Sequence, residues 1–302
     1  MNRLRLATRS SPLARLQATR VARRLEAAGA ADEVVLVLTE TRADRRLEVP
    51  IATFGGEGVF VVEVEQAVLE GRADAAVHSA KDLPASGAPV GLALAAVPER
   101  AAVEDALVGR RLDELGPGAV VATGSARRRA QLAWARPDLG FVELRGNIGT
   151  RLERVPAGGA AVVALAALER LGLDGQVAEV LATSVVLPQV GQGAIAVRCR
   201  EDDQATLAAL SRIDDRGARR AVEAERAFLA RLGGGCEAPV GALARVAPGG
   251  GLVVEGLLAS LDGHVVVRRR VAGDDPAETG HRLAEELLSL DGGRALAAQA
   301  SP

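Results

Sequence analysis

The sequence predicts an α/β protein made of two similar α/β units followed by a small α+β domain. Short apolar segments typical of buried strands, 34–38, 73–77 and 92–97, alternate with helical patterns. The alternation starts again after about residue 100. After Cys236 the pattern changes to two alternating strands joined by Asp262-Gly263, a strong hairpin signal. We expect domain 1 to comprise residues 1–98 with 193–213, domain 2 residues 99–192, and domain 3 residues 214–302.

The first unit is predicted to open with a helix. Ser11 and Pro12 are typical of a helix start, an N-cap followed by proline at the first helical position. Apolar residues then recur at helical spacing at Leu13, Leu16, Val21 and Leu25. The polar, glycine-rich segment 42–58 is expected to be a long mobile loop, and such loops are usually functional or disordered. A later strand, 194–199, is expected to return to this unit.

The remaining elements follow from the same patterns. The second unit is expected to contain strands at 120–122, 141–144 and 161–165, with helices at 126–135 and 150–155. The third domain is expected to contain helix 218–232, strands 252–258 and 264–271, and a last helix from about 276 to 290.

Composition excludes several classes of protein. Of the 302 residues, 48% are hydrophobic and 25% charged, which is an ordinary globular balance. A net charge of −2 gives no overall attraction to nucleic acid. The chain has no run of 18 apolar residues and no signal-peptide pattern at its start, so we expect no membrane association and a cytoplasmic location. The scattered His and Cys residues predict no metal site.

Of the two cysteines, Cys236 is the stronger candidate for chemistry. It follows Gly233, Gly234 and Gly235, which leave the backbone free to approach a bulky group, and it is expected in a loop. A free cysteine is more often a small buried hydrophobic residue, and Cys199, on a predicted strand, fits that description. Packing explains a Gly-Gly-Gly-Cys loop poorly.

The segment 77–82 (VHSAKD) comes just after a predicted strand, where α/β sheets bind ligands. Lys81 is the single lysine among 37 basic residues, which is either chance or a site where arginine will not substitute. Lys81 and Asp82 are either two solvated turn charges, or a carboxylate that exchanges protons and stabilises a cation beside an ammonium group.

Arginines recur at predicted helix starts and strand-to-helix turns. Free N–H groups at such positions favour anions, and arginine binds carboxylates or phosphates through two hydrogen bonds. The arginines concerned are Arg9, Arg127, Arg128, Arg129, Arg145 and Arg151, and Arg170 is a further candidate. Together they predict a polyanionic ligand held between two domains. The sequence contains no Walker motif and no Gly-x-Gly-x-x-Gly that opens a helix after a strand, so a nucleotide is not indicated.

Six stretches, in this order, resemble the hydroxymethylbilane synthase (porphobilinogen deaminase) family. They extend over about four fifths of the chain, and the segment after residue 245 carries no comparable motif. The stretches are 7–14 (ATRSSPLA), 77–84 (VHSAKDLP), 125–128 (SARR), 144–151 (LRGNIGTR), 190–194 (VGQGA) and 234–236 (GGC).

The resemblance implies a fold and a reaction. The first two domains would be like type II periplasmic binding proteins, and the third would carry a dipyrromethane cofactor in thioether linkage to Cys236. Four porphobilinogen molecules would add in turn, each losing ammonia, and hydrolysis would release linear hydroxymethylbilane. Asp82 would be the catalytic residue, stabilising the azafulvene cation and handling the pyrrole proton. The family resemblance also suggests a monomer.

The resemblance assigns further residues to two sets. The cofactor-binding set is Ser79, Lys81, Asp82, Thr123, Ser125, Arg127, Arg128 and Gly146, besides Cys236. The substrate-binding set is Arg9, Ser11, Gln17, Phe60, Arg145, Arg151, Arg170 and Gln192. Departures from the family pattern are Ala43, Thr53, Glu57 and Gly124, none of which touches Asp82 or Cys236.

Two other classes stay open at this point. A cytoplasmic anion-binding solute-binding or ligand-sensing protein would explain the arginines, but it leaves the cysteine loop without a purpose. A pyridoxal phosphate enzyme would use Lys81 as its Schiff-base lysine. The adjacent Asp82 and the lack of a clear glycine-rich phosphate-binding loop argue against it.

Overall fold

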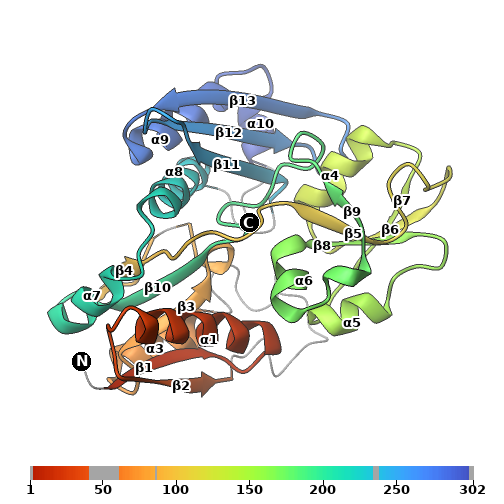
Figure 1. Ribbon diagram of the computed structural model, residues 1–302. Coiled ribbons are helices and arrows are strands. Elements are labelled where there is room, and N and C mark those ends of the chain that lie inside the picture. The colour runs from red at the N-terminus through yellow and green to blue at the C-terminus, as the bar shows by residue number, and fades with distance from the viewer. Residues whose placement is uncertain (1–2, 41–60, 86, 234–237, 299–302) are drawn as a thin grey trace. The chain divides into compact units, whose positions relative to one another are not determined.

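The computed structural model describes residues 3–40, 61–85, 87–233 and 238–298 (Figure 1). By contacts the chain forms two compact units. Unit 1 comprises residues 1–101 and 194–219, and unit 2 comprises residues 102–193 and 220–302.

Unit 1 is a five-stranded sheet in the order β2-β1-β3-β10-β4. Its strands are β1 (Arg3–Arg9), β2 (Glu33–Thr39), β3 (Ala75–Ser79), β4 (Leu92–Ala96) and β10 (Ile195–Arg200). β1 pairs in parallel with β2 and β3, whereas β10 runs antiparallel between β3 and β4. The predicted return of segment 194–199 to this unit is therefore confirmed. The alternation of charged and apolar residues at the start of the chain turns out to be β1, a strand that the sequence analysis did not identify.

Helices cover both faces of this sheet. They are α1 (Pro12–Ala27), α3 (Val62–Leu69) and α7 (Gln204–Ser211), and a further helix, α8 (Arg216–Leu232), begins in this unit and continues in unit 2. α1 and α7 pack through Val21, Leu25 and Leu210 on one face, and α3 packs through Val64 and Val68 on the other. Ser11 caps α1 and Pro12 begins it, as predicted.

The predicted apolar face of α1 is wrong in one position. Leu16 is 36% exposed, whereas the polar side chain of Gln17 is 3% exposed. Val21 and Leu25 are buried as predicted, so Gln17 takes the place of Leu16 on the buried face of the helix.

Unit 2 contains a second five-stranded sheet, in the order β7-β6-β8-β5-β9. Its strands are β5 (Asp105–Gly109), β6 (Val120–Ala122), β7 (Gly140–Val142), β8 (Ala160–Ala164) and β9 (Val177–Leu181). Its helices are α4 (Ala126–Ala135), α5 (Ile148–Glu153) and α6 (Leu165–Leu171). α4 packs through Leu132 on one face, and α6 packs through Leu168 on the other. Strands β5 and β9 were not predicted.

The rest of unit 2 is a three-stranded antiparallel sheet with helices. It consists of β11 (Val240–Val246), β12 (Leu252–Ala259), β13 (Val266–Gly273), α9 (Pro276–Leu288) and α10 (Gly293–Ala298). The predicted hairpin at Asp262-Gly263 joins β12 to β13, and Gly263 has the positive φ of 76° that such a turn requires. β11 was not predicted.

The fold class is thus the expected one, two α/β sheets and a small C-terminal α+β part. The three sheets fall in the three ranges expected to form domains. Contacts nevertheless group the second and third sheets in one unit. The three-domain boundaries therefore stay a prediction.

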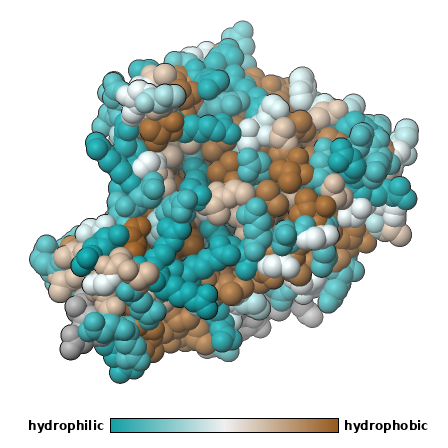
Figure 2. Space-filling view, in the orientation of Figure 1, coloured by the Kyte–Doolittle hydropathy of each residue, from teal (hydrophilic) through white to brown (hydrophobic). Residues whose placement is uncertain are grey.

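The visible face of the molecule mixes hydrophilic and hydrophobic residues (Figure 2). Large exposed hydrophobic residues include Val90 and Trp134, at 96% and 56% exposure. Single residues of this kind are normal on protein surfaces. None of the described helices combines the length and the apolar character needed to cross a membrane.

Helices α8 and α9 of unit 2 approach so closely that one glycine is required. A Cβ atom built on Gly280 would lie 2.2 Å from the carbonyl oxygen of Ala224 and 2.8 Å from the backbone nitrogen of Phe228. Alanine is normally the better helix former by about 1 kcal/mol. We expect the clash to outweigh this helix preference, so that Gly280→Ala lowers the free energy of unfolding by about 1–3 kcal/mol.

Urea or guanidinium unfolding followed by circular dichroism would measure this change. The control is Gly175→Ala, because nothing lies within 4 Å of a Cβ at that position. A Gly280→Ala protein as stable as the control would contradict the close packing of the two helices.

Candidate active site

The end of β3 carries the segment that the sequence analysis singled out. Ser79 is the last residue of β3, and Ala80, Lys81 and Asp82 form a short 3-10 turn. The backbone N–H of Ala80 donates to the carbonyl of Ala194 at 3.0 Å, which fixes the turn at the edge of the sheet. Lys81 and Asp82 are both half-buried.

This turn lines a pocket of unit 1 together with the start of α1. Because β1 and β3 are parallel, their carboxyl ends lie at the same edge, where α/β sheets bind ligands. The pocket brings together five of the predicted site residues from both predicted sets. They are Arg9, Ser11, Gln17, Ser79 and Asp82. Residues that are about 70 positions apart in the sequence thus face one cavity.

Two of the pocket residues are held in place by hydrogen bonds. The buried side-chain amide of Gln17 donates to the Ser79 hydroxyl at 2.8 Å, which joins α1 to β3. The Ser11 hydroxyl accepts a hydrogen bond from the backbone N–H of Ala14 at 3.4 Å, so Ser11 caps the helix as well as lining the pocket. The rim of the pocket is therefore built from groups with defined orientations.

His78 lines the pocket, and its side chain is almost completely buried. Burial lowers its pKa from 6.5 to about 3, and the positive charges of Arg198 and Arg9 contribute to the shift. The carboxylate of Glu65 lies 2.5 Å from Arg198 and 3.7 Å from Nε2 of His78. All three side chains are nearly inaccessible, so His78 of the pocket lies beside a buried ion pair that no sequence pattern indicates.

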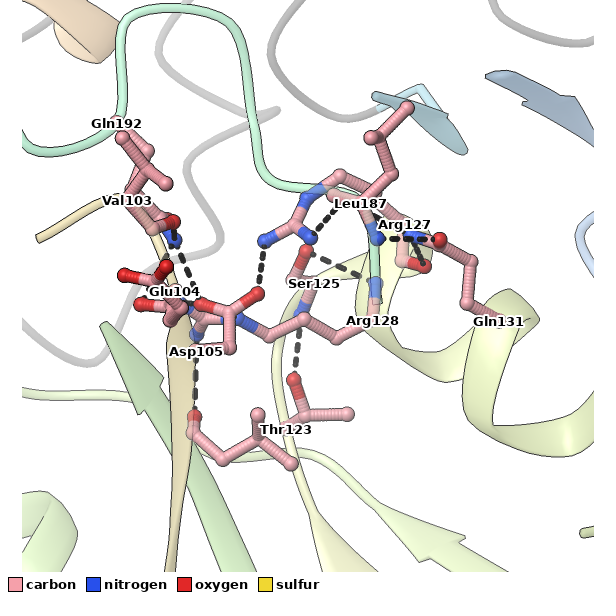
Figure 3. A network of polar contacts seen from close by, with 11 residues as sticks. Val103, Glu104, Asp105, Thr123, Ser125, Arg127, Arg128, Gln131, Leu187 and Gln192 are labelled. Atoms are coloured by element: carbon pink, nitrogen blue, oxygen red, sulfur yellow. Dashed lines mark hydrogen bonds and ion pairs between the residues drawn. The ribbon is translucent and has the colours of Figure 1, made fainter. Parts of the chain in front are cut away.

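Unit 2 contains a second polar cluster, centred on Asp105 (Figure 3). Oδ2 of Asp105 is 2.8 Å from Nη2 of Arg127, and Oδ1 is 2.7 Å from Nη2 of Arg128. Oδ1 also accepts a hydrogen bond from the side-chain amide of Gln192 at 2.9 Å. Arg127, Arg128 and Gln192, all predicted site residues, are therefore brought together by an acid that the sequence analysis did not consider.

Each arginine of this cluster makes further contacts. Arg127 donates to the carbonyl of Leu187 at 2.5 Å, and Arg128 donates to the carbonyl of Val162 at 3.1 Å. Burial raises the pKa of Asp105, but the charges of the two arginines outweigh this effect and hold the pKa below its ordinary value. The carboxylate is therefore ionised whenever the protein is folded near neutral pH.

The turn before α4 is ordered by predicted site residues. Ser125 is the N-cap of α4, and its hydroxyl accepts from the backbone N–H of Arg128 at 3.4 Å. The Thr123 hydroxyl accepts from the backbone N–H of Ser125 at 3.2 Å. A Cβ at Gly124 would lie 2.8 Å from the carbonyl oxygen of Leu144, so a larger residue here would need the backbone to move.

The other arginines predicted for the site occupy separate positions in unit 2. Arg145 is partly exposed and pairs with Glu143 at 2.9 Å, and Arg151 donates to the carbonyl of Gly146 at 2.8 Å. Arg170 is buried and donates to the carbonyl of Gly193 at 2.7 Å. Each therefore has a structural contact within its own unit.

Cys236, Phe60 and the family departures Ala43, Thr53 and Glu57 lie outside the described residues. The other cysteine, Cys199, is fully buried on β10, and burial raises the pKa of its thiol to about 11. A thiol with that pKa is a poor nucleophile. The described residues contain no group of His, Cys, Asp or Glu side chains that could hold a metal ion.

Two family models match this chain. The "Porphobilinogen deaminase, dipyromethane cofactor binding domain" model matches residues 4–208, and the "Porphobilinogen deaminase, C-terminal domain" model matches residues 219–289. Similar proteins include porphobilinogen deaminases of Roseiflexus sp. strain RS-1 and Brevibacillus brevis. The first is 47% identical over 97% of this chain and 98% of its own length, and the second is 41% identical over 98% and 97%.

Some solved structures show a weak similarity to this chain. They include the VFT2 domain of Bordetella pertussis BvgS, with 16% identity, a TM-score of 0.39 and coverage of 70% of this chain and 86% of that one. A TRAP periplasmic solute binding protein from Desulfovibrio salexigens has 11% identity and a TM-score of 0.41, with coverage of 70% and 72%.

The sheets, the pocket and the matched models define a class of enzyme, transferases with a dipyrromethane cofactor. The chain belongs to the porphobilinogen deaminase family, over nearly its whole length. The family resemblance drawn from the six sequence stretches is thereby confirmed. The solute-binding and pyridoxal phosphate alternatives are not favoured.

The pKa of His78 makes stability depend on pH. The unfolded chain binds a proton on this histidine below about pH 6.5, whereas the folded chain does so only below about pH 3. The stability that neutral His78 contributes is fully present above pH 6.5 and is lost as the pH falls towards 3. We expect His78 to account for about 2 kcal/mol of lost stability between pH 7.5 and pH 5.

Denaturant unfolding of the wild type and of His78→Gln at both pH values would measure this contribution. The variant should lose less stability on acidification than the wild type. His281→Gln, an exposed histidine on α9, is the control and should behave as the wild type does. Equal pH dependence in all three proteins would show that His78 is not buried in neutral form.

Proposed function

We propose that this chain condenses four porphobilinogen molecules one after another, with loss of ammonia each time, and releases linear hydroxymethylbilane by hydrolysis. The observation that carries the proposal is the pocket of unit 1, which combines a carboxylate, an arginine and neutral hydrogen-bonding groups at Asp82, Arg9, Ser79 and Gln17. Such a set suits a substrate that has carboxylates and a pyrrole N–H and that becomes cationic when ammonia leaves.

Asp82 is the catalytic residue of this proposal. Its carboxylate is half-buried at the pocket, where it can accept the hydrogen bond of a pyrrole N–H and stabilise positive charge that develops on the ring. The same oxygen atoms can take a proton from the ring and return it. Lys81 is adjacent to Asp82 in the sequence. Its positive charge can pair with a carboxylate of the bound chain of pyrrole rings.

The arginines bind the carboxylates of the substrate and of the growing product. Arg9 lines the pocket, and the proposal adds Arg145, Arg151 and Arg170 as further carboxylate-binding residues. Each porphobilinogen brings two carboxylates, so a product of four rings needs many cations. Ser11 and Gln17 complete the substrate set, and Phe60 belongs to it on the family resemblance alone.

The residues present fit a dipyrromethane cofactor. When bound, it supplies the pyrrole ring to which the first substrate is joined. Arg127 and Arg128 offer two guanidinium groups opposite one buried carboxylate, and Nε of Arg127 has no hydrogen-bond partner among the described residues. Thr123, Ser125 and Gly146 lie at the turns before α4 and α5, where backbone N–H groups can donate to an anion.

Cys236 is the proposed attachment point. Of the two cysteines, Cys199 is buried with a raised pKa, which leaves Cys236 as the thiol able to form a thioether. The three preceding glycines give it room for a bulky substituent. The proposal further includes porphobilinogen as the substrate, a monomeric state and a cytoplasmic location. It includes no metal and no nucleic-acid partner.

The attachment point can be tested by mass. We expect the purified protein, denatured and weighed intact, to carry the added mass of two linked pyrrole rings. Cys236→Ser should have the mass of the bare polypeptide, and the control Cys199→Ser should keep the added mass. A bare wild type is incubated with porphobilinogen and weighed again, and an unchanged mass would contradict the proposed function.

The role of Asp82 has a separate test. Asp82→Asn keeps the size of the side chain but removes its charge and its basicity, so we expect the rate of product formation to fall by about 10²–10⁴-fold. The covalent cofactor should remain in the intact mass. Asp113→Asn, at an exposed residue paired with Arg111, should keep wild-type turnover. Turnover near the wild-type rate in Asp82→Asn would remove this carboxylate from the mechanism.

A further inference from the structure

The arginine cluster of unit 2 has more positive than negative charge. Two guanidinium groups, those of Arg127 and Arg128, surround the single carboxylate of Asp105, which is completely buried. Within the described part of the chain this is the one carboxylate paired with either of them. The cluster therefore carries one uncompensated positive charge, which is costly in a buried place unless an anion binds there.

Arg127 also has a group that points to a ligand. Its side chain is 3% exposed, and Nε is buried without a hydrogen-bond partner among the described residues. Its two terminal nitrogens are already used, one for the Leu187 carbonyl and one for Asp105. An unsatisfied buried N–H costs free energy, so an anion that accepts a hydrogen bond from this Nε would be favoured.

Asp105 also fixes the direction of both guanidinium groups. Each of its oxygens binds a different arginine, and Arg128 is held through both Nε and Nη2 at 3.1 and 2.7 Å. Burial lowers the pKa of Arg127, Asp105 opposes that effect, and Arg128 adds to it. Without the carboxylate, two like charges would face one another in a buried place, and their side chains would move apart.

Gln192 holds the carboxylate in turn. It is completely buried, and its amide nitrogen lies 2.9 Å from Oδ1 of Asp105 and 2.7 Å from the carbonyl oxygen of Val103 (Figure 3). The carbonyl of Val103 is close in sequence to Asp105, so Gln192 ties the carboxylate to its own backbone. The amide nitrogen of Gln192 therefore donates to groups of the protein, which suits a supporting role.

We propose that Asp105, supported by Gln192, is a positioning residue that orients Arg127 and Arg128 and leaves them one net positive charge, so that the pair receives a single carboxylate of the dipyrromethane cofactor. This rests on the proposed function, and it moves Gln192 from the substrate-binding set to a role behind the cofactor. Neither Asp105 nor Gln192 touches the cofactor in this arrangement.

The test measures cofactor loading rather than turnover. Apoprotein is incubated with porphobilinogen, and the covalently loaded fraction is followed over time by intact mass, at a temperature where circular dichroism shows each variant folded. We expect Asp105→Asn to take up the cofactor about ten-fold or more slowly than the wild type. The reason is that the arginine pair no longer directs charge-assisted hydrogen bonds towards the carboxylate of the cofactor.

The matched control is Asp74→Asn. Asp74 also binds one arginine through both oxygens, with Arg5 at 2.7 and 3.2 Å, but it lies in unit 1 on the turn into β3 and is somewhat more exposed. This control removes the same charge while keeping the size of the side chain, and it should load at the wild-type rate. Loading of Asp105→Asn at the rate of this control would overturn the proposal.

A second variant covers the case in which Asp105→Asn does not fold. Gln192→Met keeps the volume and the charge of the cluster but removes the hydrogen bond to Asp105, so loading should slow several-fold while the thermal unfolding midpoint falls only modestly. Unchanged loading in Gln192→Met would also overturn the proposal. A wild type that takes up no cofactor under these conditions contradicts the proposed function itself, which keeps the two failures apart.

Discussion

The parallel pairing of β1 with β3 is the constraint on which the pocket of unit 1 depends. Leu6 of β1 is aligned with Ala75 of β3, so both strands end at the same edge of the sheet. Arg9 therefore emerges beside Ser79 and the turn that carries Asp82. The antiparallel return of β10 then supplies the carbonyl of Ala194 that holds this turn. Loss of this pairing would separate the carboxylate from the arginine.

Buried carboxylates play a comparable part in both units. Glu65 pairs with Arg198 beside His78 of the pocket, and Asp105 pairs with two arginines in unit 2. Removing a charge from water costs several kcal/mol, and a buried pair often contributes little net stability. Such pairs do fix the positions of neighbouring groups. In this protein the neighbours are His78 of the segment 77–82 and the arginines assigned to the cofactor.

The many arginines therefore divide into two kinds. Arg9 lines the pocket and can face a ligand, whereas Arg127 and Arg128 are held from behind by a carboxylate and keep one net charge for an anion. A polyanionic product needs both kinds. In the proposed mechanism the pocket arginine would bind successive substrates, whereas a rigid buried pair suits a group that stays attached throughout the reaction.

The sequence by itself determined the alternation of strands and helices, the cap of α1, the Asp262-Gly263 hairpin and the family, because these depend on local chemistry and on short ordered motifs. It also identified most of the residues proposed for the site. Only the tertiary structure showed the position of Asp105, whose partners Arg127 and Gln192 are 22 and 87 residues away. It likewise decided that Leu16 is exposed while Gln17 is buried, since Gln17 bonds to Ser79, 62 residues away. A carboxylate or an amide carries no local sign of its partner, because the fold alone brings distant side chains within hydrogen-bonding distance.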